Sequence, residues 1–503
     1  MRRLGAVVLA WATLLSSAPG WAAGTLRVGL NEDPDLMDPA RAGSYVGRIV
    51  FAALCDKLVD IDAKLTIVPQ LATSWSWSAD NLALTMKLRP GVKFHDGEAF
   101  DAAAVKVNID RYRTASYSLR KGEVAAVSSV EVEGPLTVTL RLSTPNAPLL
   151  AVLADRAGMM LSPKALAEQG DKLADNPVCA GPFKFVERLA QDHITLERFP
   201  GYWDAENVFL DRIIYRPIPN TAIKLVNLVS GQLDIIERMA ASDVPAVKKN
   251  PDLKFLPQPG VAYQGVLFNV GHGPAAKTPV GENPKVRRAF EMALDRAAIN
   301  QVAFEGTQTP SNQFEAPNTP YWDAALPVGP RDVEGAKKLL KEAGFTRVAM
   351  TLQVDNSPVS VQVGELIQSM TAEAGFDVKI LAQETNANVS AARAGTFDAY
   401  VIIWSGRADP DGNSSIWLSK NGFLNWGSYD NPAHDTLLAQ ARGLTDPGQR
   451  KALYAKANAI AQADMPMAVL FHQTWLFAAS KKLSGFNLVP DGLIRPQGIR
   501  LDN

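Results

Sequence analysis

The stretch that decides the fold is Lys338-Leu-Leu-Lys-Glu-Ala-Gly-Phe345, because its pattern occurs again a short distance downstream. In the first copy a helical pattern ends at the glycine and leads into an apolar segment at 348–354. In the second, Met370-Thr-Ala-Glu-Ala-Gly-Phe376 leads into 378–381. Each glycine stands where the C-terminus of a helix favours a left-handed residue. Helix, glycine turn and strand repeated in this way predict parallel crossovers and therefore an α/β domain.

A third strand pattern follows, and it ends in a loop with the composition of a binding site. Asp398-Ala-Tyr-Val-Ile-Ile403 runs directly into Trp404-Ser-Gly-Arg-Ala-Asp-Pro-Asp-Gly412. Ligands of open α/β sheets sit beyond the carboxyl ends of strands, so this loop lies where a site is expected. Its indole supplies a flat apolar wall, and its glycine allows close approach of the backbone.

Charged side chains of both signs give this loop two interpretations. Arg407 suits a carboxylate held by two parallel hydrogen bonds, and Asp409 or Asp411 suits an ammonium group. In the alternative, Arg407 and Asp409 neutralise each other on a solvated turn, and Trp404 belongs to the core. The residue types leave both interpretations open.

Outward from this unit, the chain divides into a helical segment and a β-rich one. Asn283-Pro284 predicts the start of a helix through 285–302, with asparagine as the cap and proline at the first helical position. Upstream, alternation predicts a strand at 25–31 and hairpins at 75–88 and 129–142. Helical spacing predicts a helix at 45–58.

The N-terminus has the pattern of a secretory signal peptide. Met1-Arg2-Arg3 precedes an apolar run at 4–15 and small residues at Gly20, Ala22 and Ala23, which predicts cleavage after Ala22 or Ala23. The run is shorter than the roughly 20 residues of a membrane-spanning helix, which favours export over an uncleaved anchor. No cysteine lies near the cut for lipid attachment. We therefore expect the mature chain in the periplasm, without membrane insertion.

Composition and motif searches argue against several classes of function. The 51 basic and 52 acidic side chains indicate no nucleic-acid partner. About 480 residues after the signal peptide exceed one hydrophobic core and predict two or three domains. The five histidines are scattered, so neither a metal site nor a cofactor is predicted. No nucleophile motif occurs, and the nearest match to a phosphate loop, 271–278, has Ala276 in place of a required glycine.

Two cysteines, Cys55 and Cys179, remain after signal cleavage. In an oxidising compartment they can form a disulfide. Two separately buried thiols are the alternative, because the sequence does not show whether the two Cα atoms approach within bonding reach.

Further motifs are spread along almost the whole chain. They are Val68-Pro-Gln-Leu-Ala-Thr-Ser-Trp75, Leu88-Arg-Pro-Gly-Val-Lys-Phe-His-Asp-Gly97, Asn176-Pro-Val-Cys-Ala-Gly-Pro-Phe183, Gly201-Tyr-Trp203, Asn283-Pro-Lys-Val-Arg-Arg-Ala-Phe290, Ala293-Leu-Asp-Arg296 and the 404–412 loop. Together they resemble the family 5 extracellular solute-binding proteins of ABC importers, which include dipeptide, oligopeptide and nickel receptors.

The resemblance implies an α/β, two-lobed fold of the type II periplasmic binding proteins, similar to the large cluster C group, with an extra β-rich subdomain. After the signal peptide at 1–23, it implies domain Ia at 24–45, 175–258 and 477–503, domain Ib at 46–174, and domain II at 259–476. It also implies a monomeric receptor, not an enzyme. Such a receptor closes around a peptide or peptide-like solute and delivers it to the membrane permease of an ABC importer.

The 404–412 loop departs from the pattern of the peptide receptors. They commonly place an acidic residue a few positions after the tryptophan, where it binds the ligand's α-amino group. Here those positions are Arg407 and Ala408, and the nearest acid is Asp409. The departure leaves room for opines, modified peptides and other anionic solutes. Nickel is disfavoured, because no histidine lies between Trp404 and Trp426.

The predicted wall of the ligand cleft combines this loop with polar and aromatic residues elsewhere. The twelve residues are Trp404, Ser405, Gly406, Arg407, Asp409, Ser44, Tyr45, Tyr117, Tyr263, Asn269, Asn425 and Trp426. Two other classes of function remain alternatives. A secreted hydrolase would need a nucleophile and base or a metal site. A periplasmic chaperone or signalling receptor would use the cleft for a protein partner.

Overall fold

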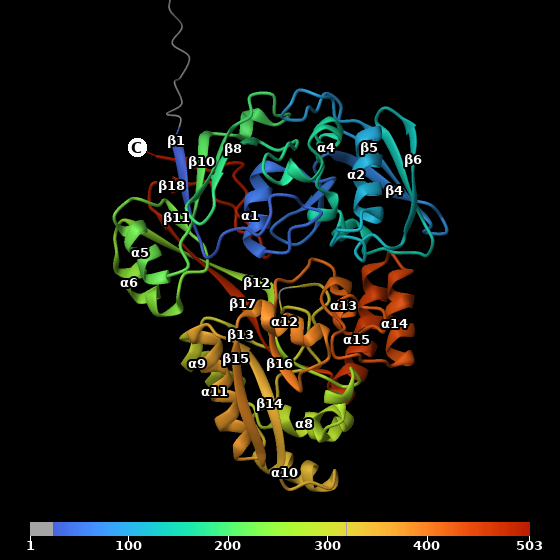
Figure 1. Ribbon diagram of the computed structural model, residues 1–503, viewed down its shortest axis with the longest axis vertical. Coiled ribbons are helices and arrows are strands. Elements are labelled where there is room, and N and C mark those ends of the chain that lie inside the picture. Colours follow the sequence, from blue (N-terminus) through green and yellow to red (C-terminus); the bar gives the residue numbers. More distant parts are fainter. Residues whose placement is uncertain (1–23, 318, 503) are drawn as a thin grey trace, which may run out of the picture.

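The computed structural model describes residues 24–317 and 319–502, which form two lobes, one above the other in Figure 1. The predicted signal peptide at 1–23 lies outside the described residues. Two long antiparallel strands, β12 (Leu253–Phe268) and β17 (Met467–Ser480), connect the lobes. No helix within the described ranges is long and apolar enough to span a bilayer.

One sheet runs through both lobes by way of these two strands. Its order among the described residues is β15-β14-β16-β12-β17-β11-β1-β10-β9-β8, with β13 added to β17. The upper strands are β1 (Gly24–Leu30), β8 (Phe183–Leu189), β9 (His193–Arg198), β10 (Leu210–Pro217) and β11 (Ile235–Ile236). Helix α1 (Tyr45–Leu54) belongs to the same core as β1 and β10. Helices α5 (Thr221–Val229) and α6 (Val244–Lys249) pack in a second cluster with β11 and β17.

The lower lobe contains the predicted helix–glycine–strand repeat. Helix α10 (Val333–Glu342) leads into β14 (Val348–Asp355), and α11 (Pro358–Ala372) leads into β15 (Phe376–Gln383). Gly344 and Gly375 have φ values of 89° and 106°, as the turn pattern predicts. Strand β14 is parallel to both β15 and β16 (Ala399–Trp404), which confirms the parallel crossovers. Further elements of this lobe are α7 (Pro279–Glu282), α12 (Thr385–Arg393), α13 (Ser415–Leu418), α14 (Pro432–Arg442), α15 (Pro447–Asp464) and β13 (Thr309–Pro310).

Two predicted helices have different bounds. The single helix expected at 285–302 is two helices, α8 (Pro284–Met292) and α9 (Arg296–Phe304). They are separate because Asp295 is extended and its side chain accepts the Ala298 N–H as the cap of a new helix. The helix expected at 45–58 ends at Leu54, since Cys55 is extended.

The β-rich subdomain occupies the upper right of Figure 1 and has its own core. Its sheet has the order β4-β5-β7-β6, in which both predicted hairpins are present. The elements are β4 (Ala72–Trp77), β5 (Ala83–Leu88), β6 (Val127–Gly134), β7 (Thr137–Leu142), α2 (Ala102–Thr114), α3 (Leu149–Val152) and α4 (Pro163–Gln169). Small antiparallel pairs are β2 (Val59–Ile61) with β3 (Ile67–Pro69), and β18 (Leu483–Ser484) with β19 (Arg500–Leu501).

A disulfide joins Cys55, at the end of α1, to Cys179, and their Cα atoms lie 4.9 Å apart. Both side chains are buried. Cys179 also forms a backbone bridge with Leu161. The bond ties together the two points at which the chain enters and leaves the β-rich subdomain.

Candidate functional site

A cavity of about 560 Å³ lies between the β-rich subdomain and the lower lobe. Its upper wall comes from residues within 122–126 and 143–155, and its lower wall from residues within 404–423 and 435–442. The lining combines apolar side chains such as Trp404 with charged ones. This volume is within the range of about 300–1,000 Å³ that is typical of small-molecule sites. The cavity can therefore enclose a solute the size of a short peptide.

The turn after β16 places Arg407 in the cavity wall. Gly406 has a φ of 72°, and a Cβ there would lie 2.4 Å from the Val261 carbonyl oxygen, so the turn requires glycine. The Arg407 backbone N–H donates to Asn413 Oδ1 at 2.7 Å. Buried Tyr263 donates its hydroxyl to the Asn413 carbonyl, also at 2.7 Å. Tyr263 thus supports the turn from the core and is not a cavity-lining residue.

The Arg407 side chain is fixed by its own loop. Nη1 donates to Ser405 Oγ at 3.2 Å and to the Gly406 carbonyl at 2.7 Å, and the guanidinium lies 4.6 Å from the centre of the Trp404 ring. Trp404 packs edge-on against Trp417 and also lines the cavity. The guanidinium is therefore oriented before any ligand arrives.

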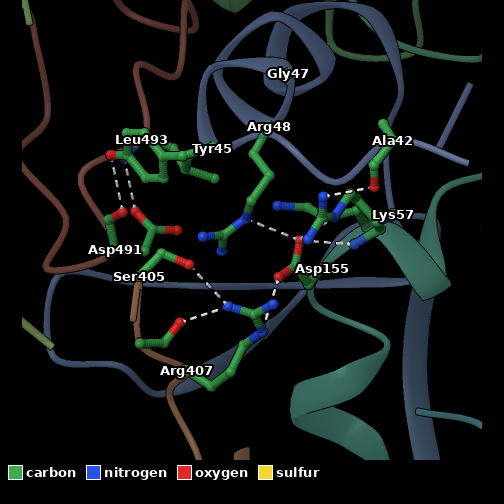
Figure 2. Close-up of polar contacts among 12 residues, drawn as sticks. Ala42, Tyr45, Gly47, Arg48, Lys57, Asp155, Ser405, Arg407, Asp491 and Leu493 are labelled. Carbon is green, nitrogen blue, oxygen red and sulfur yellow. Dashed lines mark hydrogen bonds and ion pairs between the residues drawn. The ribbon is translucent and has the colours of Figure 1, made fainter. Parts of the chain in front are cut away.

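Asp155 of the β-rich subdomain is the ion-pair partner of Arg407, and their contact crosses between the lobes. Arg407 Nε lies 3.2 Å from Asp155, Arg48 Nε lies 3.1 Å away and Arg156 Nε lies 3.9 Å away. Figure 2 shows Arg48 above and Arg407 below, with Asp155 on one side of them and Ser405 on the other. Burial raises the pKa of Asp155, but Arg48, Arg407 and Arg156 together hold that pKa well below its usual value. The carboxylate is therefore ionised.

The two acids of the loop have other partners, so the alternative in which Arg407 pairs with Asp409 is wrong. Asp409 accepts two bonds from Arg450, at 2.6 and 2.8 Å, and also caps the short 3₁₀ turn that begins at Pro410. Asp411 accepts from Arg442 Nε at 2.8 Å. Each carboxylate is already neutralised by an arginine, which argues against the ammonium-binding role suggested by the sequence.

Ser44, Tyr45 and Tyr117, the wall residues predicted in the upper lobe, are absent from the lining of the cavity. Ser44 caps α1, the helix that carries Arg48. Tyr45 stacks on Trp475 with ring centres 4.7 Å apart, and its hydroxyl donates to the Asp491 carbonyl. Tyr117 is exposed, and two arginine side chains lie over its ring.

The other predicted wall residues stabilise the lower lobe. Asn269 is buried and donates to three backbone carbonyls. Asn425 donates to two carbonyls and accepts one backbone N–H. Trp426 packs edge-on against Trp417. Of the twelve predicted residues, Trp404, Arg407 and Asp409 line the cavity.

Sequence reasoning missed the upper half of the charged cluster. Arg48 lies within a helix that looked apolar, and Asp155-Arg156 lies in the stretch Leu149–Leu161, which is otherwise almost entirely apolar. A pair of charges inside an apolar stretch was the available signal, because such charges are buried only when they are paired. Among the described residues, no group of three or more histidine, cysteine or carboxylate side chains converges to hold a metal ion.

Comparison with known proteins places this chain and its fold in a family. Residues 66–425 match the bacterial extracellular solute-binding proteins, family 5 middle region. The chain belongs to this family. A curated relative, the glutathione-binding protein GsiB of Pectobacterium atrosepticum, is 31% identical over 492 residues, which covers 95% of this chain and 94% of the relative.

Two solved structures of similar proteins carry bound solutes. The periplasmic binding protein DppA of Helicobacter pylori, in complex with the peptide STSA, has a TM-score of 0.86 and 26% identity, covering 96% of this chain and 98% of its own. The binding protein AgaA of A. tumefaciens, in complex with agropinic acid, has a TM-score of 0.84 and 26% identity, covering 95% and 99%. These similarities confirm the two-lobed fold and the family 5 resemblance that the motifs indicated.

Proposed function

We propose that this family 5 protein is the periplasmic substrate-binding component of an ABC importer, and that it captures a peptide or peptide-like solute in the 560 Å³ cavity. The observation that carries the proposal is the origin of the cavity walls. One wall comes from the β-rich subdomain and the other from the lower lobe, so movement of one lobe relative to the other opens or closes the cavity. The names of similar proteins, which specify glutathione, a peptide and agropinic acid, point to the same class of solute.

The connection between the lobes supports a closing motion. Strands β12 and β17 carry the chain between the lobes, and their pairing has a register shift between Pro259 and Tyr263. We place the domain limits at 258/259 and 476/477, inside these two strands, with 46–174 as the β-rich subdomain. A few residues in two strands can absorb a change of lobe angle, and ligand binding then shifts the population toward the closed form. The closed, monomeric form is the one that delivers the solute to the permease.

The proposed role is binding without chemistry. The charged residues that line the cavity include Asp409 and Asp411, which are held in ion pairs with Arg450 and Arg442. Carboxylates neutralised in this way are poor general bases.

A ligand screen tests this function. The mature protein is mixed with a panel of short peptides and opines, and its thermal unfolding is followed. A true ligand at 100 times its Kd should stabilise the fold by about 2.7 kcal/mol. Chromatography of the same mixtures should recover the solute unchanged. A cleaved product would establish a hydrolase, whereas a panel in which no small molecule stabilises the protein would favour a protein partner.

A further inference from the structure

The charged cluster between the lobes contains more positive than negative charge. Its arginines are Arg48, Arg120, Arg156 and Arg407, and its carboxylates are Asp155 and Glu123. Four guanidinium groups against two carboxylates leave a formal charge of +2. The neighbouring charges Lys57, Asp60, Asp491 and Arg495 balance one another.

This excess charge is buried. Arg48 and Arg120 are each 4% exposed, Arg156 is 5% exposed and Asp155 is 6% exposed. Burial, together with the adjacent positive charge of Arg120, lowers the pKa of Arg156 to about 9. Uncompensated charge removed from water is costly, so a cluster of this composition favours binding of an anion.

Donors without acceptors lie in the same cluster. Arg48 Nη1 and Arg156 Nε are buried and have no hydrogen-bond acceptor among the described residues. Figure 2 shows the outer nitrogens of Arg48 turned toward the side occupied by Ser405 and away from Asp155. Asp155 and Arg407 line the cavity, and Arg48 packs directly behind Asp155. A solute in the cavity therefore meets Arg407 directly, and one that extends past Asp155 meets the Arg48 guanidinium as well.

We infer that a carboxylate of the solute binds between Arg48 and Arg407, beside Asp155 and Ser405, and that the ligand is accordingly an anionic peptide or peptide-like acid. The inference rests on the proposed function. The planar guanidinium groups, one from each lobe, match the two oxygens of a carboxylate. Asp155 and Glu123 supply two negative charges to the cluster, and the ligand carboxylate supplies a third.

Calorimetry with matched acid and amide forms of one peptide tests the subsite. The probes are glutathione and its analogue with both carboxylates converted to amides. Wild-type protein should bind the acid at least about 10-fold more tightly than the amide, as expected for charge-assisted hydrogen bonds. Arg407→Gln and Arg48→Gln should each weaken the acid by about 10-fold or more and leave the amide unchanged.

Two further variants separate charge recognition from loss of structure. Arg113→Gln removes a half-buried, ion-paired arginine of the β-rich subdomain that is absent from the cavity lining, and it should leave both affinities unchanged. Asp155→Asn raises the positive charge of the cluster, so it should increase the preference for the acid over the amide. Far-UV circular dichroism and thermal melts establish that each variant is folded.

Each outcome has a distinct meaning. Equal affinity of the wild-type protein for acid and amide would overturn the carboxylate subsite and leave the solute-binding function intact. The subsite would also be overturned if glutathione failed to bind while a neutral solute of the screen bound. Failure of every small solute would overturn the proposed function and the subsite together.

Discussion

Removing the Cys55–Cys179 disulfide should destabilise the β-rich subdomain strongly. The two cysteines are separated by 124 residues, and nearly the whole subdomain lies within the loop that they close. For a loop of this length, the chain-entropy relation predicts about 5 kcal/mol of stabilisation at 25 °C, because the bond restricts the unfolded chain. Both side chains are buried, so replacing them with alanine adds a small packing loss in the same direction.

The double variant Cys55→Ala/Cys179→Ala can be compared with the wild type by urea unfolding. We expect the free energy of unfolding of the transition that includes the β-rich subdomain to fall by about 4–5 kcal/mol. A reducing agent present during unfolding should lower the wild-type stability toward that of the variant and leave the variant unchanged. A loss below about 1 kcal/mol would refute the loop-entropy reasoning, since the packing loss alone could account for it.

Three further predictions concern the lobes, the cavity turn and a buried acid. Asn81→Gly allows the left-handed backbone at φ 56° but removes the 3.2 Å hydrogen bond from the Asn81 side chain to the Gly443 carbonyl in the other lobe. If this bond stabilises the closed form, the Kd for glutathione measured by calorimetry should rise about 5-fold. An unchanged Kd would exclude a role of Asn81 in closure. Gly406→Ala should lower the free energy of unfolding by about 2 kcal/mol in urea, because residue 406 has a positive φ and an added Cβ would contact the Val261 carbonyl oxygen. Gly134→Ala is the control, since a Cβ there meets open space and should have little effect. Equal effects of the two substitutions would contradict the strain argument. Burial raises the pKa of Glu315 from 4.5 to about 7, so its contribution to stability is full below pH 4.5 and is lost as the pH rises through 7. In urea unfolding, the wild type should therefore lose about 2.5 kcal/mol of stability between pH 5 and pH 8, and Glu315→Gln should abolish this loss.

Local sequence signals predicted the parts of this fold that are governed by local physics. The left-handed glycines Gly344 and Gly375 and the parallel strands that follow them are such parts, as is the position of the loop after β16. The break between α8 and α9 also had a local signal, the capping residue Asp295, but the apolar periodicity of the segment concealed it. The Asp295 side chain accepts a backbone N–H of α9, and its own backbone is extended. A residue that caps a new helix in this way cannot continue the preceding one, so α8 ends before Asp295.

The charged cluster could not be predicted in the same way, because its members are distant in sequence. Arg48 and Asp155 are separated by 107 residues, and Arg407 belongs to the other lobe. One of the two interpretations of the loop paired Arg407 with the nearest opposite charge, Asp409. That carboxylate instead caps the turn that follows it and faces Arg450 of α15. Proximity in sequence therefore did not identify the partner of Arg407.

The position of the cluster connects recognition of charge to movement of the lobes. Arg48 comes from the upper lobe and Arg407 from the lower one, and the Arg48 charge lowers the pKa of Arg407, in addition to the larger effect of burial. Closing the lobes therefore brings like charges together, and Asp155 alone offsets only part of their repulsion. A carboxylate placed between them removes the remainder, whereas a neutral group of the same shape does not. Charge selectivity and closure are then one property, because the interaction that distinguishes an acid from an amide is available only when both lobes contact the solute.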